Sequence, residues 1–311
     1  MVRHLAVLLP IGVLLSALAG CGGPSKPDGG GLSFRQQVAK ARQEKLPDVR
    51  ARKLTKLAYG QAKAKDVFGA EETFELAWKS CEEVTDPAGR ASVFSYLAEA
   101  QARLSNRSQA RRAARSALDA AEKIENVESR AYSLARIGRA QGAAEDPDAA
   151  AESLATAEKL GSQLEDPQGK VLVLAAVAES YHKIEKPEDA RRTLDAAGQL
   201  ATSIEDRRTR CKAITAIAAS QHQMKLADES SKSFETALAT AEKIDDPLSK
   251  AHALAELAEK LSEAGHFARS HEVLEQADLV VEKIPQPDMR RQTMQEVRRL
   301  MGTLPKPPGE G

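Results

Sequence analysis

The sequence predicts an all-α solenoid, a fold in which helical hairpins stack side by side. The body of the 311-residue chain repeats a forty-residue unit six times without gaps. Each unit places apolar and small residues three and four positions apart, which is the spacing of one helix face. Hydrophobic residues make up 42% of the chain but aromatic residues only 4%, a composition that disfavours strand-rich folds.

The chain begins with a segment typical of a secretion signal. A positively charged start precedes the mainly apolar residues 5–17, which are too few to cross a bilayer. This segment ends in Leu18-Ala19-Gly20-Cys21, which resembles the lipobox of bacterial lipoproteins. The resemblance implies a lipoprotein signal peptide over residues 1–20 and a lipid on Cys21. Ordinary signal cleavage and an uncleaved anchor are the alternatives.

Flexible segments are predicted at both ends of the mature chain. Residues 21–32 are rich in glycine and polar residues, as in a flexible tether between lipid and folded body. Residues 303–311 contain three prolines and two glycines, which favours a disordered tail. Forty-five basic and forty-five acidic residues give no net charge, so we expect no nucleic-acid partner.

Three of the six repeats start with a helix N-terminus signal, in which an Asp cap precedes a Pro whose missing N–H is harmless. These signals are Asp86-Pro87, Asp166-Pro167 and Asp246-Pro247. The predicted repeats span residues 46–85, 86–125, 126–165, 166–205, 206–245 and 246–285. We expect an N-terminal capping helix over residues 33–45 and a C-terminal capping helix over residues 286–302.

Three columns of equivalent residues indicate how each unit folds. The first helix carries an apolar column, Leu54, Phe94, Leu134, Leu174, Ile214 and Leu254. Four residues later comes a small-residue column, Ala58, Ala98, Gly138, Ala178, Ala218 and Ala258. The second helix carries an alanine column, Ala77, Ala117, Ala157, Ala197, Ala237 and Ala277. One hairpin has too little core to fold alone, so neighbouring hairpins must bury these faces together.

The repeat pattern resembles the tetratricopeptide repeat. The fourth unit reads Leu174-x-x-Val177-Ala178-x-x-Tyr181, followed by Ala190-x-x-x-Leu194-x-x-Ala197. The resemblance covers all six units and implies a right-handed solenoid whose first helices line a concave groove. The chain departs from the family pattern by lacking the opening Trp and the closing Pro and by having a longer unit. A HEAT-like stacking of longer hairpins therefore stays open.

The family's geometry also suggests which side chains face the groove. The candidate protein-binding residues are Arg52, Tyr59, Ser92, Glu99, Tyr132, Arg139, Glu179, His182, His222 and Glu259. Their columns vary between repeats while the core columns do not, as expected of a surface free to specialise. The alternative is that they are ordinary solvated helix residues.

Two basic patterns are interpreted as structural. The first recurs four residues after each unit start, at Arg50, Arg90, Arg130, Lys170, Arg210, Lys250 and Arg290. We expect these residues to pair with the capping aspartates rather than to form an anion-binding stripe. The second is a cluster of Arg103, Arg107, Arg111, Arg112 and Arg115. We expect it to pair with Glu71, Glu72 and Glu75 of the preceding unit.

The sequence shows no catalytic signature. It contains no glycine-rich phosphate loop, no nucleophile elbow and no Cys-x-x-Cys pair, so we expect neither an enzyme nor a cofactor. His182 and His222 share a column, but a zinc site needs further ligands, and no metal site is predicted. Cys81 and Cys211 lie too far apart to form a disulfide and are expected in the core.

Together these features predict an interaction scaffold anchored in the bacterial cell envelope. Its lipid on Cys21 would hold it to a membrane, facing the periplasm from the outer membrane where the host has one. Its partner would be another protein or a peptide bound in the groove. The alternatives are a structural spacer without a specific ligand and a small-molecule or metal-binding module near His182 and His222.

Overall fold

The computed structural model describes residues 32–305, which form fourteen helices and no strand. The helices are α1 (Phe34–Arg42), α2 (Pro47–Lys63), α3 (Val67–Glu82), α4 (Pro87–Arg103), α5 (Arg107–Ala121), α6 (Val127–Ala143), α7 (Pro147–Gln163), α8 (Pro167–Lys183), α9 (Pro187–Ser203), α10 (Arg207–Gln223), α11 (Ala227–Glu242), α12 (Pro247–Glu263), α13 (Phe267–Val281) and α14 (Pro287–Thr303). The predicted all-α solenoid is confirmed.

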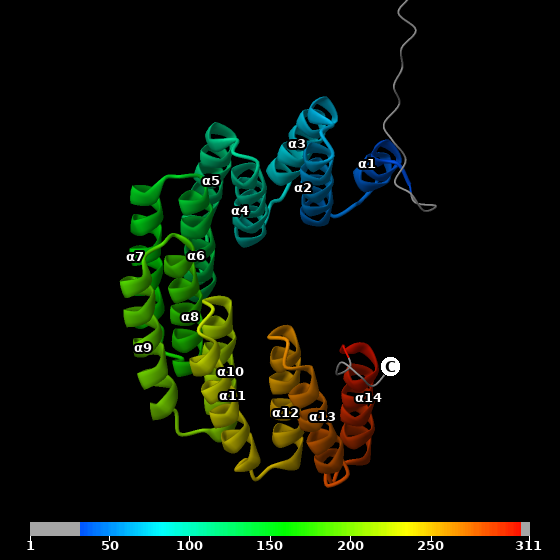
Figure 1. Ribbon diagram of the computed structural model, residues 1–311, viewed down its shortest axis with the longest axis vertical. Coiled ribbons are helices and arrows are strands. Elements are labelled where there is room, and N and C mark those ends of the chain that lie inside the picture. Colours follow the sequence, from blue (N-terminus) through cyan, green and yellow to red (C-terminus); the bar gives the residue numbers. More distant parts are fainter. Residues whose placement is uncertain (1–31, 306–311) are drawn as a thin grey trace, which may run out of the picture.

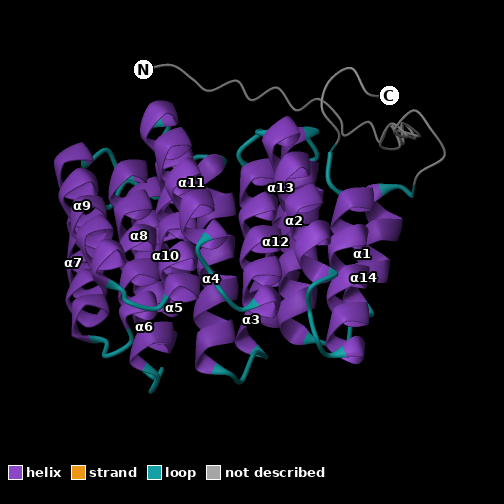
Figure 2. Cartoon of the chain, turned by 90° about the horizontal axis from the view of Figure 1, so that it is seen from below, coloured by secondary structure: helices purple, strands orange, loops and turns teal. Residues whose placement is uncertain are grey.

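The helices form six hairpins, from α2 with α3 to α12 with α13. Each first helix, from α2 to α10, packs against the first helix of the next hairpin, and α12 packs against α14. Each second helix packs against the first helix of the next hairpin as well. The stack follows a C-shaped path, with α4, α6 and α8 inside the curve and α5, α7 and α9 outside it (Figure 1). Figure 2 shows the helices standing side by side along this path.

The first helices begin where the sequence places their caps. The side chains of the residues before helices α4, α6, α8, α10 and α12 each accept a hydrogen bond from the backbone N–H three residues later, at 2.6–2.8 Å. Such a bond satisfies one of the free amides of the first turn. The five capping residues are Asp86, Asn126, Asp166, Asp206 and Asp246.

One turn residue in every repeat adopts the left-handed backbone conformation between the first and second helices. These residues have φ between 56° and 82° and are Lys65, Ser105, Glu145, Glu185, Lys225 and Gly265. This conformation ends a helix and reverses the chain within a few residues. Because only the last of the six is glycine, five repeats form the turn at a steric cost.

The core runs the length of the stack. All six members of the alanine column are fully buried, at 0% exposure. The small residues let the helix backbones approach closely, which explains why the columns exclude larger side chains. Gly138 shows how tight the packing is, since a Cβ atom there would lie 2.6 Å from the Leu154 Cγ atom and 3.1 Å from the Ala150 carbonyl oxygen.

Single helices close the two ends of the stack. At one end, Ser33 and Gln36 form a reciprocal capping box at the start of α1, which packs against α2. At the other end, α14 packs against α12 and α13, as the first helix of a further hairpin would. Thr303, assigned by sequence to the tail, is instead the last residue of α14.

The predicted signal and tether are largely outside residues 32–305, as are Cys21 and residues 306–311. Within the described range, none of the helices combines the length and the apolar character that a bilayer span requires.

Candidate functional site on the inner face

Polar side chains of the first helices meet between neighbouring repeats. The guanidinium of Arg139 on α6 donates two hydrogen bonds, of 2.9 and 2.6 Å, to Oε1 of Glu99 on α4. The Ser220 hydroxyl on α10 donates a hydrogen bond of 2.6 Å to Glu179 on α8. Because the first helices α4, α6 and α8 lie inside the curve, these contacts run along the inner face.

Two arginines share one neutral acceptor on this face. Arg52 of α2 donates a hydrogen bond of 2.6 Å to the Ser92 hydroxyl of α4. Arg136 of α6 donates a hydrogen bond of 2.9 Å to the same oxygen. Three consecutive first helices therefore bring two positive charges to a group that carries none.

The charged groups that act on Arg136 are two arginines and one glutamate. Burial lowers the pKa of Arg136, and the positive charges of Arg52 and Arg139 lower it further, while Glu99 opposes the shift. The carboxylate of Glu99 already accepts both hydrogen bonds from Arg139. A carboxylate or phosphate group placed beside Arg52 and Arg136 would therefore relieve an existing repulsion.

Three tyrosines lie on the same three helices as these arginines. Tyr59, Tyr96 and Tyr132 are half-buried and belong to α2, α4 and α6. The Arg52 guanidinium lies 5.9 Å from the centre of the Tyr96 ring. Burial raises the pKa of Tyr132 to about 12, so its hydroxyl stays protonated and can donate a hydrogen bond at neutral pH.

We call this group of residues the basic inner patch. Its members combine positive charge with amphipathic aromatic rings, a composition enriched in protein-binding surfaces. The basic inner patch consists of Arg52, Tyr59, Ser92, Tyr96, Glu99, Tyr132, Arg136 and Arg139.

The other half of the inner face pairs acidic with basic side chains. Lys212 of α10 pairs with Glu256 of α12 at 3.2 Å. His252 of α12 lies 3.7 Å from Glu296 of α14. These carboxylates each have a basic neighbour on the adjacent first helix, whereas Arg52 and Arg136 share a neutral acceptor.

The structure brings together some of the sequence-predicted groove residues. Six of the candidates lie in the basic inner patch through the contacts above or through their helix face, whereas Glu179 accepts a hydrogen bond from Ser220 in the other half. Tyr96 and Arg136 were missed by the sequence analysis. Each lies four residues after a predicted candidate, Ser92 and Tyr132 respectively, and helix periodicity alone could have identified them.

Two other candidates, His182 and His222, are half-buried near the ends of α8 and α10. Over residues 32–305, no group of three or more His, Cys, Asp and Glu side chains is placed to hold a metal ion. The two cysteines in this range, Cys81 and Cys211, are buried and free, as expected. Burial raises the pKa of their thiols to about 12 and about 11, so both are protonated at neutral pH.

The predicted ion pairs between the basic column and the capping aspartates are wrong. Each aspartate is instead used by its own helix, as Asp206 accepts from the Thr209 amide at 2.7 Å. Three of the seven basic side chains, those of Arg50, Arg210 and Arg290, instead reach the end of the preceding helix, where backbone carbonyls lack partners. Arg210 donates to the Ile204 carbonyl at 2.6 Å, and Arg50 donates to the Glu44 carbonyl at 2.8 Å.

The predicted pairing of the arginine cluster with the preceding unit is also wrong. Arg107 and Arg111 reach forward to the α6–α7 turn, where Arg107 forms an ion pair with Glu145. Arg112 stacks over Trp78, with its guanidinium carbon 4.0 Å from the ring centre. In the part of the chain that the structure describes, Glu71, Glu72 and Glu75 form no ion pair with this cluster.

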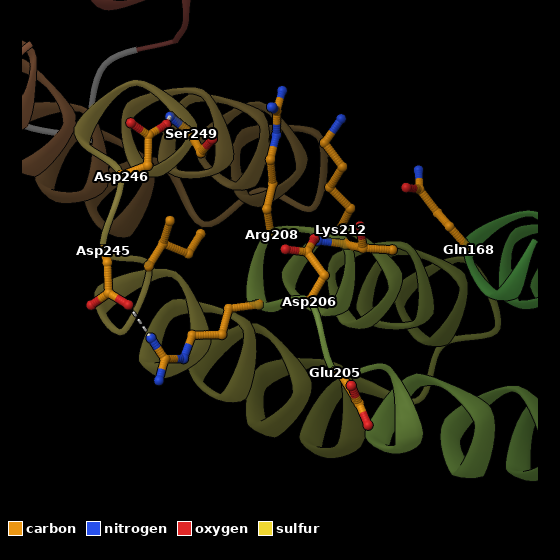
Figure 3. A pocket seen from close by; sticks show the side chains of 11 residues that line it. Gln168, Glu205, Asp206, Arg208, Lys212, Asp245, Asp246 and Ser249 are labelled. Atoms are coloured by element: carbon orange, nitrogen blue, oxygen red, sulfur yellow. Dashed lines mark hydrogen bonds and ion pairs between the residues drawn. The ribbon is translucent and has the colours of Figure 1, made fainter.

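A hollow of about 770 Å³ lies elsewhere, where α10 and α12 begin. Charged side chains of both signs line it, as the labelled residues in Figure 3 show. Arg207 pairs with Asp245 at 2.5 Å, and Asp206 and Asp246 cap their helices. Because Arg207, Asp206 and Asp246 already have partners here, whereas Arg52 and Arg136 share one neutral acceptor, we place the candidate site on the basic inner patch.

Comparison with known proteins leaves the chain without an assigned family. No protein-family model and no curated protein matches it. Among solved structures, it is similar to Ton1535 from Thermococcus onnurineus NA1, with a TM-score of 0.47 and 16% identity over 85% of this chain and 94% of that one. It is also similar to a Rap protein complexed with Competence and Sporulation Factor, with a TM-score of 0.35 and 15% identity over 86% of this chain and 83% of that one.

Proposed function

We propose that the protein is a protein-interaction scaffold that binds an extended segment of a partner along its inner face. The observation that carries the proposal is the shared acceptor, in which Arg52 and Arg136 both donate to the Ser92 hydroxyl. An acidic side chain of a partner would offer two carboxylate oxygens to these two guanidinium groups, and charge-assisted hydrogen bonds of this kind are the stronger ones.

The carboxylates on the other half of the inner face would give the bound segment a direction. The acidic part of the segment would lie against the basic inner patch. A basic part would lie toward Glu259 on α12 and Glu296 on α14. Charge complementarity of this sort sets orientation and selects partners more than it adds affinity.

A protein segment fits this surface better than a nucleic acid does. The chain carries no net charge, and its basic inner patch spans only three helices, whereas a nucleic-acid surface needs a longer basic track. The role is one of binding, without a catalytic step assigned to any residue.

We further propose that the scaffold is anchored in the bacterial cell envelope through a lipid on Cys21. The lipobox-like Leu18-Ala19-Gly20-Cys21 supports this proposal, and residues 22–31 would serve as the tether. Metabolic labelling with a palmitate analogue tests it directly. Label on the wild-type protein that is lost in Cys21→Ser is expected, and equal labelling of both would contradict the anchor.

Binding to the inner face is tested with a fluorescent acidic hexapeptide, followed by anisotropy at low salt and near 0.15 M salt. Arg136→Gln and Arg52→Gln are each expected to weaken binding about tenfold, since each removes a charge-assisted hydrogen bond. The matched control is Arg103→Gln, which changes an exposed arginine of α4. Equal weakening by all three variants, or no binding to the wild type, would reject the proposal.

A further inference from the structure

The first hairpin exposes two neighbouring apolar side chains. Val67 and Phe68 begin α3 and are 57% and 84% exposed. Within residues 32–305, no other adjacent pair of large apolar side chains is exposed. An acidic residue at the position of Phe68 would favour the positive end of the helix, so helix stability does not explain the phenylalanine. In the other five repeats a polar or small residue holds this position, namely Ser108, Asp148, Glu188, Asp228 and Ala268.

The described chain begins at the same end of this hairpin. Phe34, the first residue of α1, lies against the end of α2, since a Cβ atom on Gly60 would stand 3.3 Å from the Phe34 ring. Leu32 lies two residues before Phe34 and is 48% exposed. It is therefore at the end that carries the α2–α3 turn, as are Val67 and Phe68. We call Leu32, Val67 and Phe68 the apolar tip.

Basic side chains accompany the apolar tip. Arg35, Lys63 and Lys65 are exposed at the same end of the hairpin. The acidic residue of the turn, Asp66, is held within the hairpin, because it accepts hydrogen bonds from a backbone amide of α3 at 3.1 Å and from the Gln61 side chain at 2.9 Å. An apolar surface with basic residues around it suits the interface of a bilayer that contains anionic lipids.

Other exposed parts of the stack carry the opposite charge. At the far end of the first hairpin, exposed Leu46 stands two residues from both Glu44 and Asp48. Two repeats further on, the α6–α7 turn carries Glu145 and Asp146. Carboxylates are repelled by anionic headgroups. A bilayer would therefore meet the stack at the apolar tip rather than at these places.

We propose that the apolar tip inserts into the interface of the bilayer that anchors the protein. The inference rests on the proposed lipid on Cys21, because only ten residues separate this cysteine from Leu32. A chain of that length spans at most about 40 Å, which keeps the tip close to the membrane. The tip would enter the headgroup region, and the basic side chains around it would contact anionic lipids. Since α1 and α2 stand at one end of the C-shaped stack, this end would face the membrane (Figure 1).

The anchor makes a weak contact effective. Burial of two or three apolar side chains is favourable, but it gives little membrane affinity to a free protein. A short tether holds the tip at a high effective concentration next to the bilayer. The proposal therefore predicts contact at the tip when the chain is attached to lipid.

Tryptophan fluorescence on vesicles tests this contact. The chain from Cys21 onward is coupled through that thiol to a maleimide lipid, which is selective because Cys81 and Cys211 are buried. The vesicles contain phosphatidylcholine and phosphatidylglycerol with brominated acyl chains, which quench tryptophan on contact. Phe68→Trp places the reporter at the tip. The matched control is Leu279→Trp, at an exposed apolar position of α13.

The two reporters should behave differently. The emission added by Phe68→Trp is expected to move to shorter wavelengths and to be quenched, because an indole ring favours the membrane interface. The emission added by Leu279→Trp should remain that of a tryptophan in water. The wild type supplies the contribution of Trp78, the one native tryptophan. Equal quenching of both reporters would overturn the proposal, as would an unquenched Phe68→Trp, which would leave the tip to a protein partner.

A double variant tests the apolar side chains themselves. Val67→Ala with Phe68→Asp gives the first repeat the pair that the fifth repeat has as Ala227-Asp228. A Leu32→Trp reporter should be quenched on vesicles, and this quenching should be lost in the double variant. Circular dichroism verifies that the variant is folded. Unchanged quenching would show that the tether alone brings Leu32 to the bilayer and would overturn the proposal.

A second double variant tests the charges. Lys63→Gln with Lys65→Asn removes two cations, and asparagine tolerates the left-handed conformation of residue 65. Quenching of Phe68→Trp on anionic vesicles should fall to the level found on phosphatidylcholine alone. Quenching that depends neither on these lysines nor on phosphatidylglycerol would contradict the proposed contact with anionic lipids.

The inserted tip and the lipid anchor can fail separately. The maleimide lipid supplies the attachment, so the quenching does not depend on acylation in the cell. Absence of palmitate label on Cys21 would reject the anchor, whereas absence of quenching would reject only the insertion of the apolar tip.

Discussion

Arg136 of α6 donates a hydrogen bond of 2.9 Å to the Ser92 hydroxyl of α4, forty-four residues earlier in the chain. The same hydroxyl accepts from Arg52 of α2, so the contact joins three consecutive repeats. Two guanidinium groups on one neutral acceptor are unfavourable for an isolated chain but suited to binding an anion. Functional surfaces often retain such a conflict at the expense of stability.

This relationship predicts that Arg136→Met raises the stability of the free protein. The substitution keeps most of the apolar stem but removes a cation that burial and two neighbouring arginines disfavour. The free energy of unfolding should rise by about 0.5–1 kcal/mol in urea titration, while binding of the acidic peptide is lost. Arg103→Met, on the exposed part of α4, should change stability by less than about 0.5 kcal/mol. Destabilisation by Arg136→Met would show that the charge is compensated within the fold.

Replacement by alanine should have opposite effects on stability at Gly138 and at Gly198. Gly138→Ala should destabilise the protein by about 1–3 kcal/mol, because the new Cβ atom would lie 2.6 Å from Leu154 Cγ. Gly198→Ala should stabilise it by about 0.5–1 kcal/mol, since nothing lies within 4 Å and alanine is the better helix former. Chemical denaturation measures both. Equal effects of the two changes would contradict the described packing of α6 against α7.

The helix caps predict how stability depends on acid. The Thr209 and Ser249 hydroxyl and amide groups lower the pKa values of Asp206 and Asp246 from their ordinary 3.8. A carboxylate with a lowered folded-state pKa contributes stability above its unfolded pKa and loses it as the pH falls through the folded value. Stability should therefore fall as the pH drops below about 4.

Asp246→Asn tests this cause. The amide oxygen can still cap the helix, as Asn126 caps α6 at 2.8 Å, but it has no proton to gain. Unfolding by urea should give nearly equal stability for variant and wild type at pH 7, and a smaller loss for the variant between about pH 5 and pH 2. An unchanged loss would assign the acid sensitivity to other carboxylates.

The core cysteines predict slow thiol chemistry. In a Cys21→Ser background, Cys81 and Cys211 are the remaining thiols, and burial raises their pKa values to about 12 and about 11. A disulfide reagent at pH 8 should modify neither in the folded protein and both in denaturant, because the thiolate is the reactive form. Rapid labelling under native conditions would show that the hairpins open there.

The fold could be predicted from the sequence because equivalent core positions recur in each of the six repeats. The alanine column recurs without exception, and an interior position that tolerates only one residue type is readily seen in a repeat. The helix starts were also predictable, since the cap of Asp86 on the Gly89 amide is local in sequence. Helix starts and core faces can therefore be predicted without knowing the curvature of the solenoid.

The contacts between repeats were predicted less well because they depend on that curvature and on competition between acceptors. The capping aspartates were expected to pair with the basic column, but their own helix amides hold them, and Arg210 binds the free Ile204 carbonyl instead. Arg112 was expected to pair with a glutamate of the preceding unit, but its guanidinium stacks on the Trp78 ring. Helix periodicity places Arg136 on the same face as Tyr132, but its sharing of the Ser92 hydroxyl with Arg52 appears only when α2, α4 and α6 are placed together.

Photo-crosslinking in the native host tests the central proposal most directly. A benzoylphenylalanine in place of Tyr96 on the inner face should give one protein adduct, and excess acidic hexapeptide should suppress it. The adduct should also disappear in Arg136→Glu, while benzoylphenylalanine in place of the exposed Thr236 of α11 should not give it. Adducts that form equally from both positions, or that neither the peptide nor Arg136→Glu affects, would contradict a binding site on the inner face.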